Sequence, residues 1–291
     1  MSALKKTTDS TVSALYEFED IQLTEKMFGK FAKHMYDLAG VDLPFSPKNH
    51  ALIRNRIVKL LRRHGLKSYE EYWAMIEHGN HELTSEFISA LTTNMTSFYR
   101  EGNHFDFLAQ QLPELYKKFG ADIRMWCAAA STGQEPYTIA MTANEVMQSI
   151  PGMKARLLAT DIDLQVLKKA SIGAYEDREM QGLPSAQRLK YFEKVKKNDT
   201  EFWRAKDSIH DMIRFAQFNL MSPKYEFQHK FHVIFCRNVL IYFDEETTKK
   251  VIDGLTSCLA PGGYLILGHS ESGNIKHANL KPLSRAVYQK T

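Results

Sequence analysis

Short hydrophobic runs alternate with helix-length segments over the second half of the chain. These runs cover residues 123–128, 156–160, 231–236 and 264–268. Such alternation is typical of βαβ units, so we expect a mostly parallel sheet. Because ligands of such sheets bind beyond the carboxyl ends of the strands, the residues that follow each run are the first candidates for a functional site.

The first part of the chain has a helical pattern from Thr24 to about Leu91, without a strand candidate. Three glycines stand where helices would end, at Gly40, Gly65 and Gly79. Ser46 precedes a proline as an N-cap would, and Ser68 with Glu71 matches a capping box. We therefore expect a flexible tail over residues 1–20 and a small all-helical domain over residues 21–91.

The remaining residues are expected to form a linker over residues 92–103 and a larger domain over residues 104–291. A helix is predicted over 185–194, and two segments, 202–204 and 212–218, alternate apolar with polar side chains. This alternation predicts a small antiparallel β-subdomain at about residues 195–218, inserted in the larger domain. Such a ribbon fits a docking element and plain packing equally well.

Composition narrows the class of protein. A length of 291 residues suggests two domains, and a formal net charge of +4 does not by itself indicate nucleic acid. Cys127, Cys236 and Cys258 lack CxxC spacing, which favours buried free thiols in a reducing compartment over disulfides or zinc. The start lacks a signal-peptide apolar region, and no run approaches the ~18 residues that span a membrane. We expect a cytoplasmic protein without a metal and without membrane insertion.

The helix expected over residues 47–64 is rich in cations and contains no acid. Its basic residues are Lys48, Arg54, Arg56, Lys59, Arg62 and Arg63. The ordinary explanation for such a surface is solvation. However, the lack of Glu and Asp forfeits the i,i+4 pairs that stabilise exposed helices. This favours an external acidic partner, either a protein or a phosphate backbone.

The loop from Ala129 to Pro136 lacks GxGxxG spacing, which disfavours NAD or FAD. Its small residues would let a ligand approach the backbone, and Glu135 could pair with an ammonium group. Asp161 ends the second hydrophobic run, where a carboxylate can accept hydrogen bonds from ribose hydroxyls. Asp161 could instead cap the next helix, but Asp163 fits that role better.

Another polar candidate follows the segment 212–218. Asn219 and Leu220 stand directly after it and could contact the edge of a base, although two residues are a short signal.

Three longer motifs carry a family resemblance. They are ALTTNMTSFYRE at 90–101, AAASTGQEPY at 128–137 and FCRNVLIYFD at 235–244. The Pro261-Gly262-Gly263 turn and the strands before it resemble the fold of class I S-adenosylmethionine-dependent methyltransferases. Together with the motifs, the chain resembles the chemotaxis receptor glutamate O-methyltransferases, the CheR family, from about residue 21 to the C-terminus.

This resemblance implies an α/β fold, in which a Rossmann-like sheet follows a small all-helical domain and carries an inserted β-subdomain. It implies methyl transfer from S-adenosylmethionine to glutamate carboxylates on the cytoplasmic helices of methyl-accepting chemotaxis receptors. The product left from the cofactor would be S-adenosylhomocysteine. The expected protein is a monomer that uses neither a metal nor nucleic acid.

The resemblance also implies roles for particular residues. Arg100 and Tyr242 would be catalytic, and Arg100 would also line the cofactor cleft. The other implied cofactor residues are Asn94, Thr96, Glu135, Asp161, Asn219, Leu220, Arg237 and Asn238. Receptor docking would use Arg54, Arg56, Lys59, Arg62 and Arg63 of the helical domain. The family often has an acid where this chain has Gln134, and the adjacent Glu135 makes an effect on catalysis unexpected.

The chemistry of the residues supports this hypothesis and leaves alternatives open. A glutamate is already ionised at neutral pH, so methyl transfer to it needs no strong general base. Arg100 could hold the incoming carboxylate, or it could simply pair with Glu101. Tyr242 could orient the substrate or exclude water, although a tyrosine in such an apolar run is more often part of a core. A nucleic-acid methyltransferase and an inactive receptor-binding module are the competing hypotheses.

Overall fold

The computed structural model describes residues 21–79, 81–273 and 275–291, so the tail expected over 1–20 lies outside the described residues. The chain divides into two compact units between Thr92 and Thr93. The segment 93–103, part of the expected linker, therefore belongs to the larger unit.

The smaller unit is all-helical, as predicted, and consists of α2 (Glu25–Ala39), α3 (Pro47–His64), α4 (Tyr69–Glu77) and α5 (His81–Leu91). Ser46 caps α3 by accepting a hydrogen bond from the Asn49 amide at 3.1 Å, and Gly65 ends it with a left-handed φ of 65°. Ser68 caps α4 by accepting a hydrogen bond from the Glu71 amide. The Glu71 carboxylate accepts from Lys67 instead of Ser68, so the predicted capping box is only half formed.

The larger unit contains a seven-stranded sheet in the order β6-β2-β1-β7-β8-β10-β9. The strands are β1 (Asp122–Cys127), β2 (Lys154–Asp161), β6 (Ile213–Gln217), β7 (Phe231–Cys236), β8 (Leu259–Leu267), β9 (Leu280–Ser284) and β10 (Val287–Lys290). The first five in sheet order are parallel to one another, and β10 runs antiparallel between β8 and β9. All four predicted strands are confirmed.

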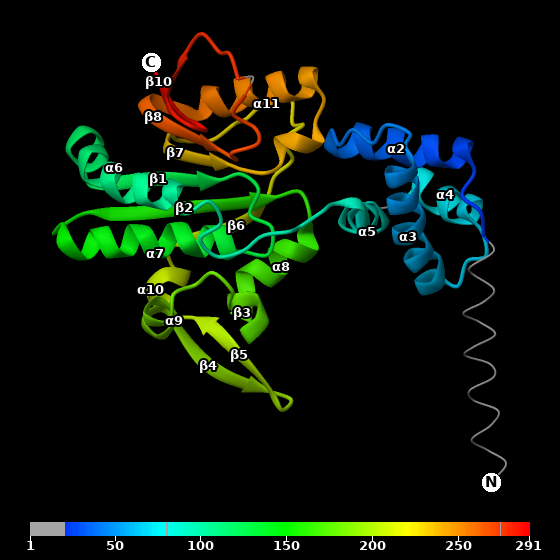
Figure 1. The fold of residues 1–291 in the computed structure, drawn as a ribbon, viewed down its shortest axis with the longest axis horizontal. Helices are drawn as coiled ribbons and strands as arrows, with labels where there is room; N and C mark the ends of the chain where they lie inside the picture. The colour runs from blue at the N-terminus through cyan, green and yellow to red at the C-terminus, as the bar shows by residue number, and fades with distance from the viewer. Residues whose placement is uncertain (1–20, 80, 274) are drawn as a thin grey trace. The chain divides into compact units, whose positions relative to one another are not determined.

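Helices cover both faces of this sheet (Figure 1). They include α6 (Asn103–Phe119), α7 (Gln134–Ser149), α8 (Leu164–Ile172) and α11 (Glu245–Cys258). Successive residues of a strand point to opposite faces. Met125 and Cys127 therefore lie in one core with α6 and α7, whereas Trp126 lies in a second core with α11. This burial on both faces explains why the strands were visible as continuous hydrophobic runs.

The inserted segment differs from the prediction. The small sheet is formed by β3 (Ala174–Tyr175), β4 (Phe192–Lys197) and β5 (Thr200–Ala205), in the order β3-β5-β4, and lies near η1 (Asp177–Met180), α9 (Ser185–Tyr191) and α10 (Asp207–His210). The helix predicted to reach 194 ends at Tyr191, and the segment 212–218 does not pair with 202–204. It forms β6, which joins the main sheet parallel to β2.

One cause of this error is the hairpin turn between β4 and β5, which the sequence analysis did not predict. Asn198 and Asp199 have left-handed φ angles of 46° and 61°, as a two-residue hairpin turn requires. Alternating polarity alone does not specify which sheet a strand joins. Ile213 and Phe215 pack into the core of the larger unit, and this packing directs β6 to the main sheet.

The strand order defines where a ligand would bind. From β1 the chain proceeds outward to β2 on one side and to β7 on the other, so the topological switch point lies between β1 and β7. In the described part of the chain, no helix has the length and apolar character needed to cross a membrane.

Candidate active site

The loop between β1 and α7 begins the site at the switch point. Gly133 precedes α7 with a φ of 100°. A Cβ atom there would lie 2.5 Å from the Tyr175 hydroxyl and 3.0 Å from Ala170 Cβ. Position 133 therefore requires glycine for two reasons: its φ is positive, and no room is left for a side chain. Ser131 on the same loop also has a left-handed backbone, with a φ of 48°.

Asp161 lies at the carboxyl end of β2, beside this loop. Its carboxylate accepts hydrogen bonds from the backbone amides of Ser131 at 2.8 Å and Asp163 at 3.1 Å. Burial raises the pKa of Asp161 to about 6, although these amides act in the opposite direction. The carboxylate therefore helps to fix the β1 loop and retains capacity to accept further hydrogen bonds.

Asp163 caps α8, as predicted, by accepting a hydrogen bond from the Gln165 amide at 2.8 Å. Its other oxygen accepts a hydrogen bond from Asn94 Nδ2 at 3.1 Å. The Asn94 carbonyl accepts one from the Ser131 hydroxyl, also at 3.1 Å. The segment that carries Asn94 is thereby attached to the carboxyl ends of β1 and β2.

Arg237 follows β7 and is the centre of a buried ion-pair network. Its Nη1 donates to Glu135 Oε2 at 2.7 Å, and its Nη2 lies 3.0 Å from Glu101 Oε2. Nη2 also donates to the Arg100 carbonyl at 2.6 Å. Nε is buried and has no hydrogen-bond partner within the described residues. One guanidinium therefore joins the segment before α6, the first turn of α7 and the end of β7.

Glu135 is almost fully buried in the first turn of α7. Burial raises its pKa, while Arg237 acts to lower it, and the Cys127 thiol donates to its second oxygen at 3.3 Å. The expected contact of Glu135 with an ammonium group stays a prediction, because the structure pairs the carboxylate with Arg237.

Glu101 is a member of this network that the sequence did not single out as a site residue. It has a left-handed φ of 56°, and its carboxylate accepts hydrogen bonds from Asn238 Nδ2 at 3.2 Å and from the His269 amide at 3.1 Å. Burial acts to raise its pKa, but the hydrogen bond and charge of Arg237 outweigh this and hold the pKa at about 2. Glu101 is therefore ionised throughout the physiological pH range.

Two histidines lie beside Glu101. The possible ligand atoms of Glu101, His104 and His269 all lie within 4.8 Å of one another. The Glu101 oxygen that lies 3.6 Å from His104 Nδ1 is also 3.0 Å from the Arg237 guanidinium. A cation bound there would face that positive charge at short range. Burial, followed by the charge of Arg237, lowers the pKa of His104 to about 4, so the geometry fits a neutral His104 ring packed beside a carboxylate.

The two predicted catalytic residues, Arg100 and Tyr242, are both half-buried. Arg100 does not pair with Glu101; its Nη1 donates to the Met95 carbonyl at 2.9 Å. Tyr242 ends the short helix η2 (Leu240–Tyr242) and is half-buried, so the simple core interpretation does not hold for it. Thr96 is also half-buried, in the segment between Asn94 and Arg100.

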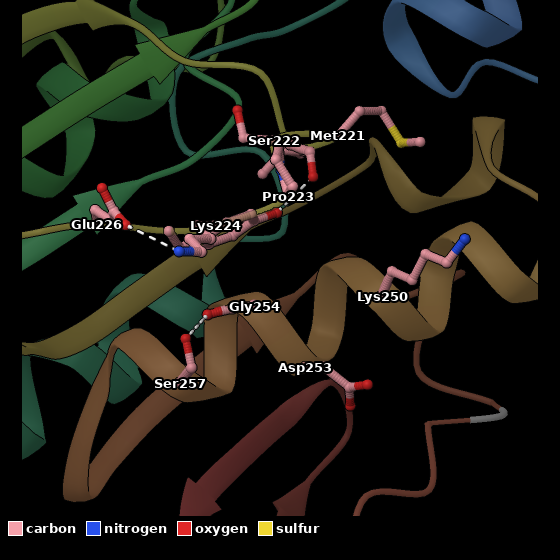
Figure 2. A pocket seen from close by; sticks show the side chains of 11 residues that line it. Met221, Ser222, Pro223, Lys224, Glu226, Lys250, Asp253, Gly254 and Ser257 are labelled. Atoms are coloured by element: carbon pink, nitrogen blue, oxygen red, sulfur yellow. Dashed lines mark hydrogen bonds and ion pairs between the residues drawn. The ribbon is translucent and has the colours of Figure 1, made fainter.

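Asn219 and Leu220 follow β6 but do not enter the Arg237 network. Asn219 Oδ1 accepts a hydrogen bond from the Met221 amide at 2.9 Å, and Leu220 is buried in the core beside α11. Leu220 also lines a hollow of about 460 Å³ between residues 220–226 and α11 (Figure 2). The two lysines that line this hollow are paired with acidic side chains. Lys224 lies 3.9 Å from Glu226, and Lys250 lies 2.7 Å from Glu246.

The basic helix α3 is less free than its sequence suggested. Arg56 donates to the carbonyls of Ala90 and Thr92 at the end of α5, and Arg63 pairs with Glu86 of α5. The inference that α3 lacks acidic partners is therefore wrong for Arg63, because the acid comes from another helix. The remaining docking candidates, Arg54, Lys59 and Arg62, are exposed.

The arrangement suits a positively charged nucleoside ligand. Glu101 and Glu135 face a single guanidinium, so carboxylates outnumber the buried cation, and Asp161 ends the neighbouring strand. Together with the strand order, these features fit a nucleoside-binding protein with a Rossmann-like sheet, the class that includes the S-adenosylmethionine-dependent methyltransferases.

Comparison with known proteins specifies the family. Residues 94–288 match the model described as CheR methyltransferase, SAM binding domain, and residues 26–92 match CheR methyltransferase, all-alpha domain. The chain therefore belongs to the CheR methyltransferase family and is an S-adenosylmethionine-dependent methyltransferase.

Proteins named chemotaxis protein methyltransferases are similar in sequence to most of this chain. A chemotaxis protein methyltransferase of Borreliella burgdorferi is 38% identical over 281 residues, which cover 93% of this chain and 96% of that protein. A chemotaxis protein methyltransferase of Escherichia coli is 35% identical over 255 residues, or 87% of each chain.

Proposed function

We propose that this protein transfers methyl groups from S-adenosylmethionine to glutamate side chains of methyl-accepting chemotaxis receptors, giving glutamate methyl esters. The observation that carries the proposal is the similarity along both units, the helical one included, to proteins named chemotaxis protein methyltransferases. The receptors would be recognised through their acidic cytoplasmic helices.

Several residues have the chemistry to hold the cofactor. Asp161 retains acceptor capacity for ribose hydroxyls beyond the Ser131 and Asp163 amides. Glu135 and Arg237 offer opposite charges to the ammonium and carboxylate of the methionine end. The other proposed cofactor residues are Asn94, Thr96, Arg100, Asn219, Leu220 and Asn238. Bound S-adenosylmethionine supplies an electrophilic methyl group on a positively charged sulfur.

The protein's part in the reaction is to align two charged partners and exclude water. The substrate carboxylate is ionised at neutral pH, so no side chain has to remove a proton. Opposite charges neutralise as the reaction proceeds, and a site without water favours that change. Within the described residues, only Nη1 of the Arg100 guanidinium is engaged, so its other donors can hold a carboxylate. Tyr242, half-buried at the end of η2, would orient that carboxylate or exclude water.

The direct test is transfer of radiolabel from methyl-labelled S-adenosylmethionine to a receptor cytoplasmic fragment. We expect base-labile label on the receptor, as methyl esters give, and a reduced rate for Arg100→Lys at saturating cofactor. The control variant Arg124→Lys alters the opposite, amino-terminal end of the sheet and should leave the rate unchanged. Label on RNA alone would indicate a nucleic-acid enzyme, and label on nothing an inactive binding module. Either result would reject the proposal.

A further inference from the structure

Glu271 follows the carboxyl end of β8 and connects two loops at the site. Its side chain is almost fully buried, with the residue 8% exposed. Oε2 accepts hydrogen bonds from the Gly268 amide at 2.6 Å and the Asn238 amide at 2.8 Å, and Oε1 accepts one from the Leu240 amide at 2.7 Å. One carboxylate therefore joins the loop after β7 to the turn after β8.

Only a carboxylate suits this position. Three amide donors converge on two oxygens, and charged acceptors form the stronger hydrogen bonds. A neutral amide has one oxygen, so at least one buried N–H would face an NH₂ group. Leaving such a buried donor without a partner is destabilising.

The backbone at both ends of the connection is adapted to it. Asn238 has a left-handed φ of 57°, a conformation that asparagine adopts more readily than other non-glycine residues. A Cβ atom at Gly268 would lie 2.6 Å from both Asn238 Nδ2 and Glu271 Oε2, so this turn requires glycine. The close approach of the two loops therefore depends on Asn238, Gly268 and Glu271.

The connected loop carries functional side chains at each end. Arg237 and Asn238 begin it, and Tyr242 ends it two residues after the Leu240 amide. Glu271 itself bonds to backbone amides, not to Arg237, Glu101 or Tyr242.

We infer that Glu271 is a positioning residue of the methyltransferase. It fixes the backbone of residues 238–240 and thereby sets where the η2 helix presents Tyr242. The part that concerns Tyr242 rests on the function proposed above, whereas the fixing of the loop does not.

Glu271→Gln tests this inference. The glutamine oxygen is expected to stay with the two donors of Asn238 and Gly268, which leaves the Leu240 amide without an acceptor. We expect the turnover number for receptor methylation to fall on the order of 100-fold, because small displacements of catalytic groups have effects of that size. Affinity for S-adenosylhomocysteine, measured by calorimetry, should change by less than about threefold, or under 1 kcal/mol.

Amide hydrogen exchange separates positioning from a general loss of stability. In Glu271→Gln, we expect faster exchange at Leu240 with unchanged exchange across β7. Equal acceleration in β7 and at Leu240 would show a merely structural role and overturn the inference. A turnover number close to that of the wild-type protein would also overturn it.

Two further variants complete the experiment. Glu246→Gln makes the same chemical change on the exposed surface of α11, where the carboxylate pairs with Lys250, and should leave turnover and exchange unchanged. If Glu271→Gln does not fold, Glu271→Asp is the test variant. It retains the charge on a shorter side chain and should have a turnover number below that of the wild-type protein. Wild-type turnover in Glu271→Asp together with fast exchange at Leu240 would contradict the inference. If the wild-type protein methylates no receptor, the proposed function fails, while exchange at Leu240 still decides whether Glu271 fixes the loop.

Discussion

At the scale of single residues, the site depends on groups whose charge state is set by burial and by one guanidinium. Arg237 is shared between Glu101 and Glu135, and arginine is the side chain whose planar donors can bridge two carboxylates. Among the described residues, Asp161 has no cation within hydrogen-bond distance, and its burial raises its pKa instead. The two kinds of carboxylate will therefore respond differently to pH.

Asp161 predicts a pH dependence for cofactor binding. Its pKa of about 6 means that it gains a proton as the pH falls through 6, and a protonated carboxyl loses acceptor capacity for ribose hydroxyls. We expect calorimetric affinity for S-adenosylhomocysteine to weaken between pH 7 and pH 5. Asp161→Asn should bind weakly at every pH and lose this dependence. An affinity of the wild-type protein that is constant from pH 5 to 7 would refute the assignment.

The same shift has the opposite sign for stability. The folded-state pKa of Asp161 lies above the unfolded value of 3.8, so folding is favoured by proton binding. That contribution is fully present below pH 3.8 and is lost as the pH rises through 6. Glu101 acts in the other direction, because its folded-state pKa of about 2 lies below the unfolded value of 4.5. Its stabilisation is present above pH 4.5 and is lost as the pH falls through 2.

The sequence predicted some site residues and could not predict others. Asp161 and Asp163 were distinguished because a strand end and a helix cap need different positions. Glu101 and Glu271 were missed, because each acts on groups distant in the sequence, such as Arg237 and Asn238. No local pattern marks an acid whose partners are brought together only by the fold.

At the scale of elements, the β1–α7 turn leads to a prediction about stability, and the basic helix α3 leads to a prediction about receptor docking. The turn is fixed by Gly133, whose backbone is left-handed and whose missing side chain makes room for Tyr175. Tyr175 in turn donates a hydrogen bond to the Thr132 carbonyl at 2.9 Å. The loop conformation therefore depends on tertiary packing as much as on local preference.

Gly133→Ala should be destabilising. The added methyl group clashes with the Tyr175 hydroxyl, and the alanine backbone has to adopt an unfavourable φ. Together these effects should lower the free energy of unfolding by about 2 kcal/mol. Gly29→Ala is the matched control, because nothing lies within 4 Å of its Cβ position in helix α2. That change should stabilise α2 by up to about 1 kcal/mol. Denaturant unfolding measures both, and equal effects would contradict the packing account.

The exposed cations of α3 should contribute to receptor docking. Reversing Lys59 and Arg62 to Glu is preferable to changing Arg56, which holds the end of α5. We expect the apparent KM for receptor to rise on the order of tenfold, since about 0.7 kcal/mol at each of two exposed pairs sums to 1.4 kcal/mol. Cofactor affinity should not change.

The control for this helix reverses two exposed lysines in the larger unit, Lys249 and Lys281, and thus makes the same change in net charge. If both double variants raise the KM equally, long-range charge explains the effect. Local docking by α3 would then be excluded.

At the scale of the whole molecule, the chain combines an all-helical unit with a methyltransferase unit, and hydrophobic periodicity predicted helices in the first and a mostly parallel sheet in the second. The predicted strands were correct because they are buried on both faces of the sheet. The inserted sheet was assigned wrongly because β4, with its charged residues such as Glu193 and Lys196, has the polarity of an exposed helix. Only pairing across the Asn198–Asp199 turn identifies it as a strand.

Mass spectrometry of receptor peptides after reaction with the wild-type protein tests the central claim most directly. The account predicts one added methyl group on glutamate side chains of the receptor's cytoplasmic helices, removed by mild base and absent without S-adenosylmethionine. Methyl groups found on lysine, on backbone amines or on nucleic acid, with receptor glutamates unmodified, would contradict it.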